Sequence, residues 1–284
     1  MKRVSGIAAP EHQIRNGRIM TENEFRVIFD TIPEAFDRHR MRYCPELFAF
    51  LLEQSGTTAE SSVLELGPGT GQATEPLLDT GCGYFCIELG SNFARVLNRK
   101  YGQRANFHLI HDDFITHDFG DRKYDLIYSA ATIQWIPEET AFGKTFSLLK
   151  PGGMLAMFLT RRDYRTPNPA LYEKIQQAYT QYFKPAIPYT HGSFRYENAL
   201  HYGFTDWQRH EFRTTHVYTA DEYVAFCGTH CDHIVTPEPY RSKLFAGLHQ
   251  AVMEFGNRIE VFDTHVLMMV KKPAGNGGKT GGDR

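Results

Sequence analysis

The sequence predicts an α/β fold built around an open, mostly parallel sheet. Between Ser61 and Leu159, short apolar runs alternate with segments of helical periodicity, a pattern typical of a parallel sheet with both faces covered. The first of these runs leads directly into a glycine-rich turn, which is where open α/β sheets bind their ligands. A chain of 284 residues can hold one large domain of this class or two small ones.

Composition and charge narrow the classes of partner. The chain is 42% hydrophobic and 23% charged, as in an ordinary globular protein. Its net charge of -2 gives no electrostatic basis for binding nucleic acid or an anionic membrane. No run approaches the ~20 apolar residues of a membrane span, and the N-terminus lacks the apolar stretch of a secretory signal. We therefore expect a cytoplasmic protein whose five cysteines are reduced thiols.

Six strands can be placed from apolar runs. Five of them lie in the alternating block, and each is a short continuous run of the kind found in buried strands. They cover residues 62–66, 84–89, 107–110, 124–129 and 154–159. A sixth strand is expected over residues 261–270, close to the end of the chain.

Two helices are placed by their end signals inside this block. Ser91 is the expected N-cap of the first, which follows the second strand. The second covers residues 138–149, and Lys150-Pro-Gly-Gly153 ends it before the fifth strand.

Further helices are expected outside the block. Pro45 and Pro169 each stand where the first turn of a helix tolerates proline. Thr219 with Glu222 predicts a capping box, and an apolar stripe over residues 244–255 predicts one more helix.

We divide the chain into four segments. Residues 1–60 form a helical cap, and residues 61–160 form the ligand-binding core. Residues 161–273 hold the final strands of the sheet and insertions, because the roughly 48 residues between Leu159 and Trp207 exceed an ordinary crossover. Residues 274–284 are rich in glycine and lack an apolar anchor, so we expect a disordered tail.

The strongest motif is Glu65-Leu-Gly-Pro-Gly-Thr-Gly71, at the carboxyl end of the first strand. A dinucleotide-binding G-x-G-x-x-G loop that starts at Gly67 needs glycine at position 72, which is Gln72. No lysine followed by serine or threonine closes the loop, so the P-loop pattern fails as well.

This motif resembles the first motif of class I S-adenosylmethionine-dependent methyltransferases. Similar counterparts of the later family motifs follow in order, each beside the expected strand, and the resemblance spans residues 36–272. Motifs that recur in the right order are far more specific than one glycine loop. They are Glu88, Asp112-Asp-Phe114, the stretch from Tyr124 to Pro137, and Lys150-Pro-Gly-Gly153.

The resemblance implies a Rossmann-like sheet of seven strands, the last antiparallel, with helical lid insertions and S-adenosyl-L-methionine as cofactor. In the family, the carboxylate matching Glu88 accepts hydrogen bonds from both ribose hydroxyls. Asp113, rather than Asp112, corresponds to the residue that receives the adenine amino group, and Phe114 to the residue that covers the ring. The implied cofactor-binding residues are Glu65, Gly67, Gly69, Gly71, Glu88, Leu89, Asp113, Phe114, Ser129 and Ala130.

The flanking segments are similar to small-molecule methyltransferases of the trans-aconitate methyltransferase group. Tyr43 lies in the segment that precedes the first strand in that group, and Trp135 matches a tryptophan common there. Arg161 suits a substrate carboxylate, with a solvated loop as the alternative interpretation. His233 is a candidate general base, with a hydrogen-bonded structural role as the alternative. These four residues are our substrate-side candidates.

Two other chemistries receive less support. Cys227, His230, Cys231 and His233 have spacings at which some could bind zinc, but a packed helix end is the favoured interpretation and we assign no metal site. A radical mechanism needs C-x-x-x-C-x-x-C, and Leu89 and Ile234 occupy the positions of the third cysteine.

We therefore expect methyl transfer to an oxygen, nitrogen or carbon nucleophile of a small molecule, a carboxylate-bearing one being a candidate. No catalytic residue is assigned, because a methyl sulfonium is already a strong electrophile and the protein mainly aligns the acceptor. Asp125 opens the fourth strand, away from the ligand edge, so we expect a structural role.

The alternatives to methyl transfer are an NAD-dependent oxidoreductase and a non-catalytic, cofactor-binding regulator. The expected protein is a monomer or a homodimer.

Overall fold

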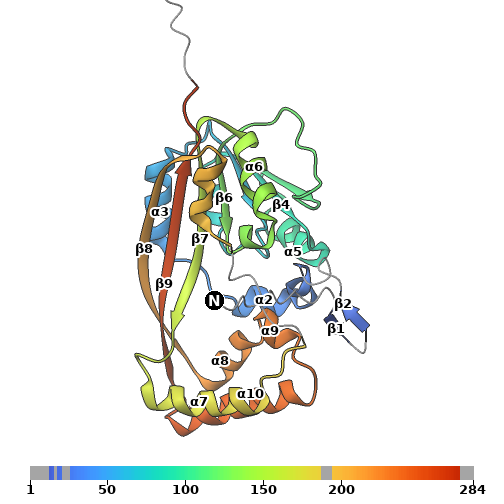
Figure 1. Ribbon diagram of the computed structural model, residues 1–284, viewed down its shortest axis with the longest axis vertical. Coiled ribbons are helices and arrows are strands. Elements are labelled where there is room, and N and C mark those ends of the chain that lie inside the picture. The colour runs from blue at the N-terminus through green and yellow to red at the C-terminus, as the bar shows by residue number, and fades with distance from the viewer. Residues whose placement is uncertain (1–12, 16–17, 21–25, 187–193, 276–284) are drawn as a thin grey trace, which may run out of the picture. The chain divides into compact units, whose positions relative to one another are not determined.

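The structure is a computed structural model that describes residues 13–15, 18–20, 26–186 and 194–275. The described residues fall into two compact units (Figure 1). We call them the helical unit and the sheet unit. The helical unit takes its residues from Met1–His39, Asn168–Thr190 and Val217–Ile259, and the sheet unit from Arg40–Pro167, His191–His216 and Glu260–Arg284.

The sheet unit is built on a seven-stranded sheet with the order β5-β4-β3-β6-β7-β9-β8. The pairs β3–β4, β4–β5, β3–β6 and β6–β7 are parallel, whereas β9 runs antiparallel to β7. This confirms the predicted α/β sheet with an antiparallel final strand. The strands are β3 (Ser62–Leu66), β4 (Gly83–Glu88), β5 (Phe107–His111), β6 (Tyr124–Ala130), β7 (Leu149–Asp163), β8 (Thr205–Tyr218) and β9 (Ile259–Lys271).

The strand order reverses at β3, since β4 lies on one side of it and β6 on the other. Open α/β sheets bind ligands beyond the carboxyl ends of the strands at such a switch point. The glycine turn after β3 therefore lies at the expected ligand edge.

Two strands differ from expectation. β7 was predicted over 154–159 but extends from Leu149 to Asp163, so Arg161 lies within a strand and not in the loop after it. β8 was not located in advance, because none of its residues is buried and a continuous apolar run is therefore missing. It is the end strand of the described sheet, and exposed and half-buried residues alternate along most of its length.

Helices cover both faces of this sheet. Buried residues of α3 (Pro45–Ser55), α4 (Glu75–Leu78) and α5 (Ser91–Tyr101) pack against one face. Those of α6 (Glu138–Leu148) and of the 3-10 helices η2 (Ile133–Trp135) and η4 (Tyr196–Tyr202) pack against the other. Pro45 begins α3 as predicted, whereas Ser91 is the first residue of α5 and Gly90 is its N-cap.

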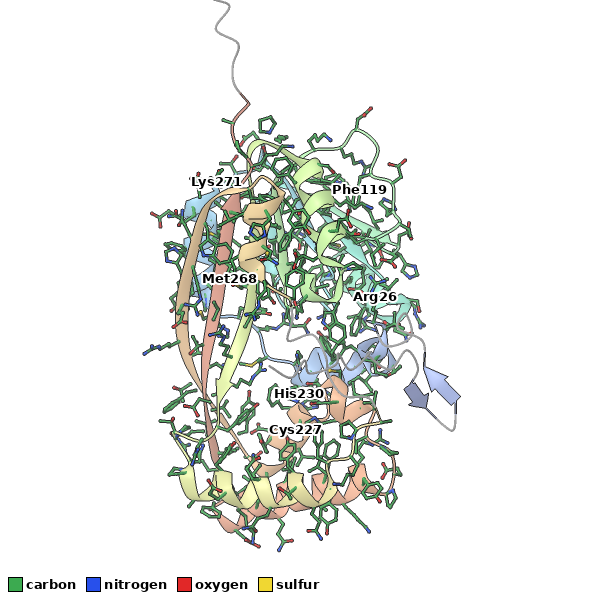
Figure 2. All side chains as sticks on the ribbon, viewed as in Figure 1. Arg26, Phe119, Cys227, His230, Met268 and Lys271 are labelled. Carbon is green, nitrogen blue, oxygen red and sulfur yellow. The ribbon has the colours of Figure 1, made fainter. Side chains whose placement is uncertain are left out.

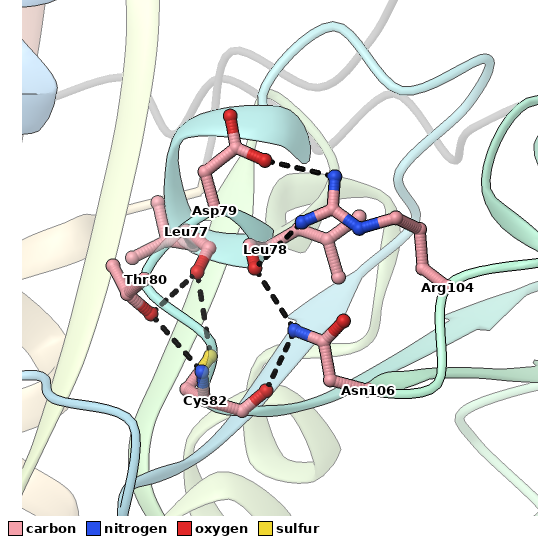
Figure 3. A network of polar contacts seen from close by, with 7 residues as sticks. All are labelled: Leu77, Leu78, Asp79, Thr80, Cys82, Arg104 and Asn106. Carbon is pink, nitrogen blue, oxygen red and sulfur yellow. Dashed lines mark hydrogen bonds and ion pairs between the residues drawn. The ribbon is translucent and has the colours of Figure 1, made fainter.

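Polar contacts join the end of α4 to the strands that follow (Figure 3). The Asn106 side-chain amide donates to the carbonyls of Leu78 and Cys82, at 2.9 and 3.1 Å. The Arg104 guanidinium pairs with Asp79 at 2.9 Å. The Leu78 carbonyl at the end of α4 thus gains donors from the residues just before β5. Cys82 and Cys86 are free thiols buried in the core beside these contacts.

The described part of the helical unit consists of short packed helices and two short antiparallel strands. α7 begins at Pro169, as predicted, and packs against α10, where a Cβ on Gly247 would lie 2.9 Å from the Ala178 Cβ. The predicted capping box is present, since Thr219 and Glu222 satisfy each other's backbone amides at the start of α8. The elements are β1 (Gln13–Arg15), β2 (Arg18–Met20), η1 (Ile28–Thr31), α2 (Pro33–His39), α7 (Pro169–Tyr182), α8 (Ala220–Cys227), α9 (Cys231–Ile234) and α10 (Tyr240–Glu254).

Within the described ranges, no helix is long and apolar enough to cross a membrane. The predicted tail lies almost entirely outside the described residues, which end at 275.

Candidate functional site

The turn after β3 requires glycine on steric grounds. Gly67, Gly69 and Gly71 have φ values of 61, 61 and 93°, in the left-handed region that other residues rarely adopt. A Cβ on Gly67 would lie 2.4 Å from Cγ2 of Thr132, whose hydroxyl donates to the Gly67 carbonyl at 3.0 Å. The turn is thereby held against the segment that follows β6.

Glu88 ends β4 with its carboxylate fixed beside this turn. Oε2 accepts from the Gly69 amide at 2.9 Å, and Oε1 accepts from the Gly90 amide at 2.8 Å. The residue is only 6% exposed. A carboxylate offers about four lone-pair sites and can accept from several donors at once, as binding of a vicinal diol requires. Leu89, the next residue, is half-buried.

Glu65 lies in β3 and its side chain is fully buried. Its Oε2 accepts hydrogen bonds from the hydroxyls of Thr74 and Tyr84, and the Tyr84 hydroxyl also contacts that of Tyr128. Burial raises the pKa of Glu65 to about 7. Among the described residues, none donates a hydrogen bond to Oε1. Glu65 stands two residues before Gly67, and its Oε1 can still accept hydrogen bonds from a ligand.

The two aspartates after β5 differ in their surroundings. Asp112 is exposed and bonds the His117 ring at 2.7 Å. Asp113 is half-buried, and its Oδ1 accepts from the Ile115 amide at 2.9 Å. Phe114 is buried against Phe119 on the α6 side of the sheet. Of these two, Asp113 has the more enclosed carboxylate, in keeping with the sequence-based choice, whereas Phe114 makes core contacts that the motif did not indicate.

Ser129 and Ala130 end β6 at the same edge. The buried Ser129 hydroxyl accepts from the Ile133 amide at 2.8 Å, which fixes the turn into η2. Ala130 is half-buried and pairs with Phe158 of β7. Trp135 is half-buried at the end of η2.

The segment before α3 links the glycine turn to β7. The Arg42 guanidinium donates to the Gly71 carbonyl at 3.2 Å. The ring of Tyr43 packs edge-on against Phe158, with centroids 4.8 Å apart, and lies 5.5 Å from the His265 ring. Burial raises the pKa of Tyr43 to about 12, so its phenol stays protonated at neutral pH. Tyr43 thus lies in the same unit as the predicted cofactor residues.

The other two substrate-side candidates differ in unit and in burial. Arg161 is exposed on β7, opposite Thr264 of β9. His233 belongs to the helical unit and is 4% exposed. Its ring contacts Asp232 Oδ1 at 2.8 Å and the Tyr179 hydroxyl at 2.9 Å. Both ring nitrogens are engaged, which favours the structural role over that of a general base.

The cysteines and histidines of the helical unit form ordinary helix-end contacts. Cys227 and His230 (Figure 2) are joined by a contact of 3.2 Å between the His230 ring and the Cys227 carbonyl. No group of three His, Cys, Asp or Glu side chains in the part of the chain that the structure describes is arranged to hold a metal ion.

Asp125 has the structural position that the sequence predicts. Its Oδ2 accepts from the Ser62 amide and from Lys150 Nζ, each at 2.7 Å. These bonds join the first residues of β3 and β6 to β7, at the opposite edge of the sheet from the glycine turn.

Sequence reasoning missed Asp263, which lies buried in β9, 3.3 Å from Arg162 of β7. No local motif marks it, because its neighbours come from other strands and only the sheet register brings them together.

Comparisons with known proteins agree with this geometry. Residues 64–157 match a family model described as a methyltransferase domain. Malonyl-[acyl-carrier protein] O-methyltransferase 2 of Ilyobacter polytropus is 32% identical over 105 residues, which cover 36% of this chain and 40% of that protein. The chain thus matches less than half the length of that relative.

Two solved structures share the fold. A proposed type II methyltransferase from Anaeromyxobacter dehalogenans has a TM-score of 0.60 at 13% identity, covering 83% of this chain and 99% of the other. Phosphoethanolamine N-methyltransferase 2 of Haemonchus contortus, solved with phosphomonomethylethanolamine and S-adenosylhomocysteine, has a TM-score of 0.53 at 17% identity. That match covers 89% of this chain and 60% of the other. Residues 64–157 thus match a methyltransferase domain, and the seven-stranded sheet has the fold of these two solved methyltransferases.

Proposed function

We propose that the protein transfers the methyl group of S-adenosyl-L-methionine to an oxygen, nitrogen or carbon nucleophile of a small molecule. The observation that carries the proposal is the Glu88 carboxylate, held by the amides of Gly69 and Gly90 at the carboxyl edge of the sheet. A fixed carboxylate beside a turn of left-handed glycines suits a ligand with a ribose diol.

The residues at this edge fit the cofactor's other groups. Glu65 Oε1, buried and with no described donor, would accept a hydrogen bond from the cofactor's ammonium group. Asp113 would receive the adenine amino group. Leu89, Phe114, Ser129 and Ala130 complete the proposed set, and Phe114 would contribute through its ring edge because the ring packs into the core. The bound cofactor supplies an electrophilic methyl group.

The contribution of the protein is then mainly orientation. A bound acceptor gains most of its rate from alignment with the methyl group and from the exclusion of water. Tyr43 and Trp135 remain our candidates for contacting the acceptor, and Arg161, being exposed, would meet only an acceptor that reaches the end of β7. A small molecule is the favoured acceptor because the net charge of -2 offers no electrostatic surface for nucleic acid.

Calorimetric titration with S-adenosylhomocysteine and, separately, NADH tests the cofactor. We expect micromolar binding of S-adenosylhomocysteine only, weakened about 100-fold in Glu88→Ala because two charge-assisted hydrogen bonds are lost. Glu139→Ala, an exposed glutamate of α6, is the matched control and should bind like wild type.

Each alternative has its own outcome. Tight NADH binding would support an oxidoreductase, although Gln72 replaces the third glycine that such a loop needs. Cofactor binding without turnover of any acceptor would support a regulatory protein. Light scattering on the same samples decides between a monomer and a homodimer.

A further inference from the structure

Three strands of the sheet continue beyond the edge at which the cofactor residues lie. β6 ends at Ala130, which pairs with Phe158, whereas β7 continues to Asp163 and stays paired with β9 as far as Phe262. At a strand rise of about 3.3 Å per residue, Arg162 lies roughly 13 Å past Phe158. β7 and β9, with β8 beside them, therefore form a wall next to the ligand edge.

One face of this wall is polar. Side chains alternate across a strand, so Thr160 and Arg162 share a face with Phe158. On that face the His265 ring contacts the hydroxyls of Thr160 and Thr214, at 2.8 and 3.1 Å. Burial lowers the pKa of His265 to about 4, so this imidazole is neutral at physiological pH.

Asp263 carries a buried carboxylate on this face that lacks hydrogen-bond donors in the described part of the chain. Its side chain is 0% exposed, with Arg162 Nε at 3.3 Å and His216 Nε2 at 3.6 Å. Neither carboxylate oxygen accepts a hydrogen bond from any residue within the described ranges. Buried carboxylates are normally hydrogen-bonded, because burial without a donor costs several kcal/mol. An acceptor group of this kind is suited to a donor that arrives with a ligand.

The polar face is continuous with the cofactor edge inside the sheet unit. Arg42 bonds the carbonyl of the glycine turn, and Tyr43 packs on both Phe158 and His265. Met41, one residue earlier, contacts Arg162 through its sulfur. Three consecutive residues thus span the distance from the glycine turn to the Asp263 cluster.

We propose that Asp263 binds the methyl acceptor by accepting a hydrogen bond from its N–H or O–H group, so that the acceptor is an amine or a hydroxyl compound. The inference rests on the proposed methyl transfer. A carboxylate acceptor is disfavoured at this position, because it would place a second anion against Asp263. Arg162 already faces Asp263 and holds the carboxylate in place.

The reaction balances with this assignment. The lone pair of the acceptor nitrogen or oxygen forms the new bond to the methyl carbon, and the carbon–sulfur bond breaks with its electrons left on sulfur. The proton of the N–H or O–H group passes to the Asp263 carboxylate, which is closed off from solvent and releases the proton only after the methylated product has left.

Methyl-labelled S-adenosylmethionine tests the acceptor class. Wild type is incubated with ethanolamine, with malonate and with a metabolite extract, and the labelled product is identified. We expect the label on a nitrogen or oxygen that carried hydrogen, and a loss of at least 100-fold in kcat/KM in Asp263→Asn. The affinity for S-adenosylhomocysteine, measured by calorimetry, should change less than threefold. Asp125→Asn, the same change at the opposite edge, should keep kcat/KM per folded molecule.

The pH profile separates acceptor binding from a merely structural role. Burial raises the pKa of Asp263 to about 6, so wild-type kcat/KM should fall below that pH as the carboxylate becomes protonated. With S-adenosylmethionine saturating, the Glu65 carboxyl acts alike in both proteins, so Asp263→Asn should lack the limb near pH 6 while its residual activity persists.

Several outcomes would overturn the inference. They are a label found only on carboxylates or carbon, full activity in Asp263→Asn, and an unchanged acid limb in that variant. If the protein binds S-adenosylhomocysteine but forms no labelled product, that result would contradict both the role of Asp263 and the proposed methyl transfer. Failure to bind S-adenosylhomocysteine would refute the proposed function itself.

Discussion

The Tyr84 hydroxyl donates a hydrogen bond to Oε2 of Glu65, which places a carboxyl group and a phenol together in the interior of the sheet. The Tyr128 hydroxyl contacts the Tyr84 hydroxyl and in turn donates to the Ala73 carbonyl at 3.1 Å. The first acidic residue of the glycine motif is therefore part of a buried polar network, and the protonation of that network affects stability as well as ligand binding.

This network should make stability depend on pH near neutrality. The pKa of Glu65 is raised from 4.5 to about 7, so the folded protein holds the proton more tightly than the unfolded chain. The resulting stabilisation is present at low pH and is lost as the pH rises through 7. Between pH 6.5 and 8 we expect a loss of about 1 kcal/mol in the free energy of unfolding without cofactor.

Denaturant titrations across this pH range measure the effect. Above pH 6.5, Asp263, whose pKa is also raised to about 6, has largely completed its titration. Glu65→Gln should flatten the profile, and Glu139→Gln should not. A profile that is equally steep in Glu65→Gln would show that another group is responsible.

Gly67→Ala should disable the turn. The substitution puts a side chain at a φ of 61°, with its Cβ 2.4 Å from Thr132 Cγ2. We expect the free energy of unfolding to fall by at least about 2 kcal/mol and S-adenosylhomocysteine binding to be lost. Gly152→Ala is the matched control, since its φ is 81° but no atom lies within 4 Å of the added Cβ. That control should cost about 1–2 kcal/mol and leave binding intact. Equal effects on binding from both variants would contradict the steric explanation.

Asp125→Ala should separate stability from ligand binding. The change removes the acceptor of the Ser62 amide and of Lys150 Nζ, and we expect a loss of about 1–2 kcal/mol. Thermal unfolding should show the loss, while calorimetry should give an unchanged S-adenosylhomocysteine affinity. Weakened binding in a fully folded variant would mean that the edge opposite the glycine turn also influences the ligand.

Gly247→Val should loosen the helical unit. Its Cβ alone would approach that of Ala178 to 2.9 Å, where α7 and α10 cross, so a branched side chain forces the helices apart. Overpacking of this kind typically costs about 1–3 kcal/mol. Ala178→Gly in the same protein should restore part of the melting temperature, and a lack of any rescue would place the strain elsewhere.

Local patterns sufficed for the central strands and for the cofactor edge. The apolar run before Gly67 and the run that ends at Glu88 are each continuous in the sequence. β3, β4 and Glu88 could therefore be predicted. The extension of β7 from Thr160 to Asp163 could not, because it pairs only with β9, about 100 residues later. Asp263 could not be predicted for the same reason, because its neighbours lie on β7 and β8 and only the strand register brings them together. Glu65 was recognised from its motif, but its bonds to Thr74 and Tyr84 depend on tertiary packing.

The exposed strand β8 has a consequence for solubility. An end strand of fourteen residues offers a long row of backbone groups to which a strand from another molecule can pair. Its exposed positions include Arg209, Glu211 and Arg213, whose charges would lose hydration against an added strand. The same alternation that leaves β8 without a continuous apolar run thus places charges where they oppose aggregation. Replacing Arg209, Glu211 and Arg213 by valine should therefore increase aggregation.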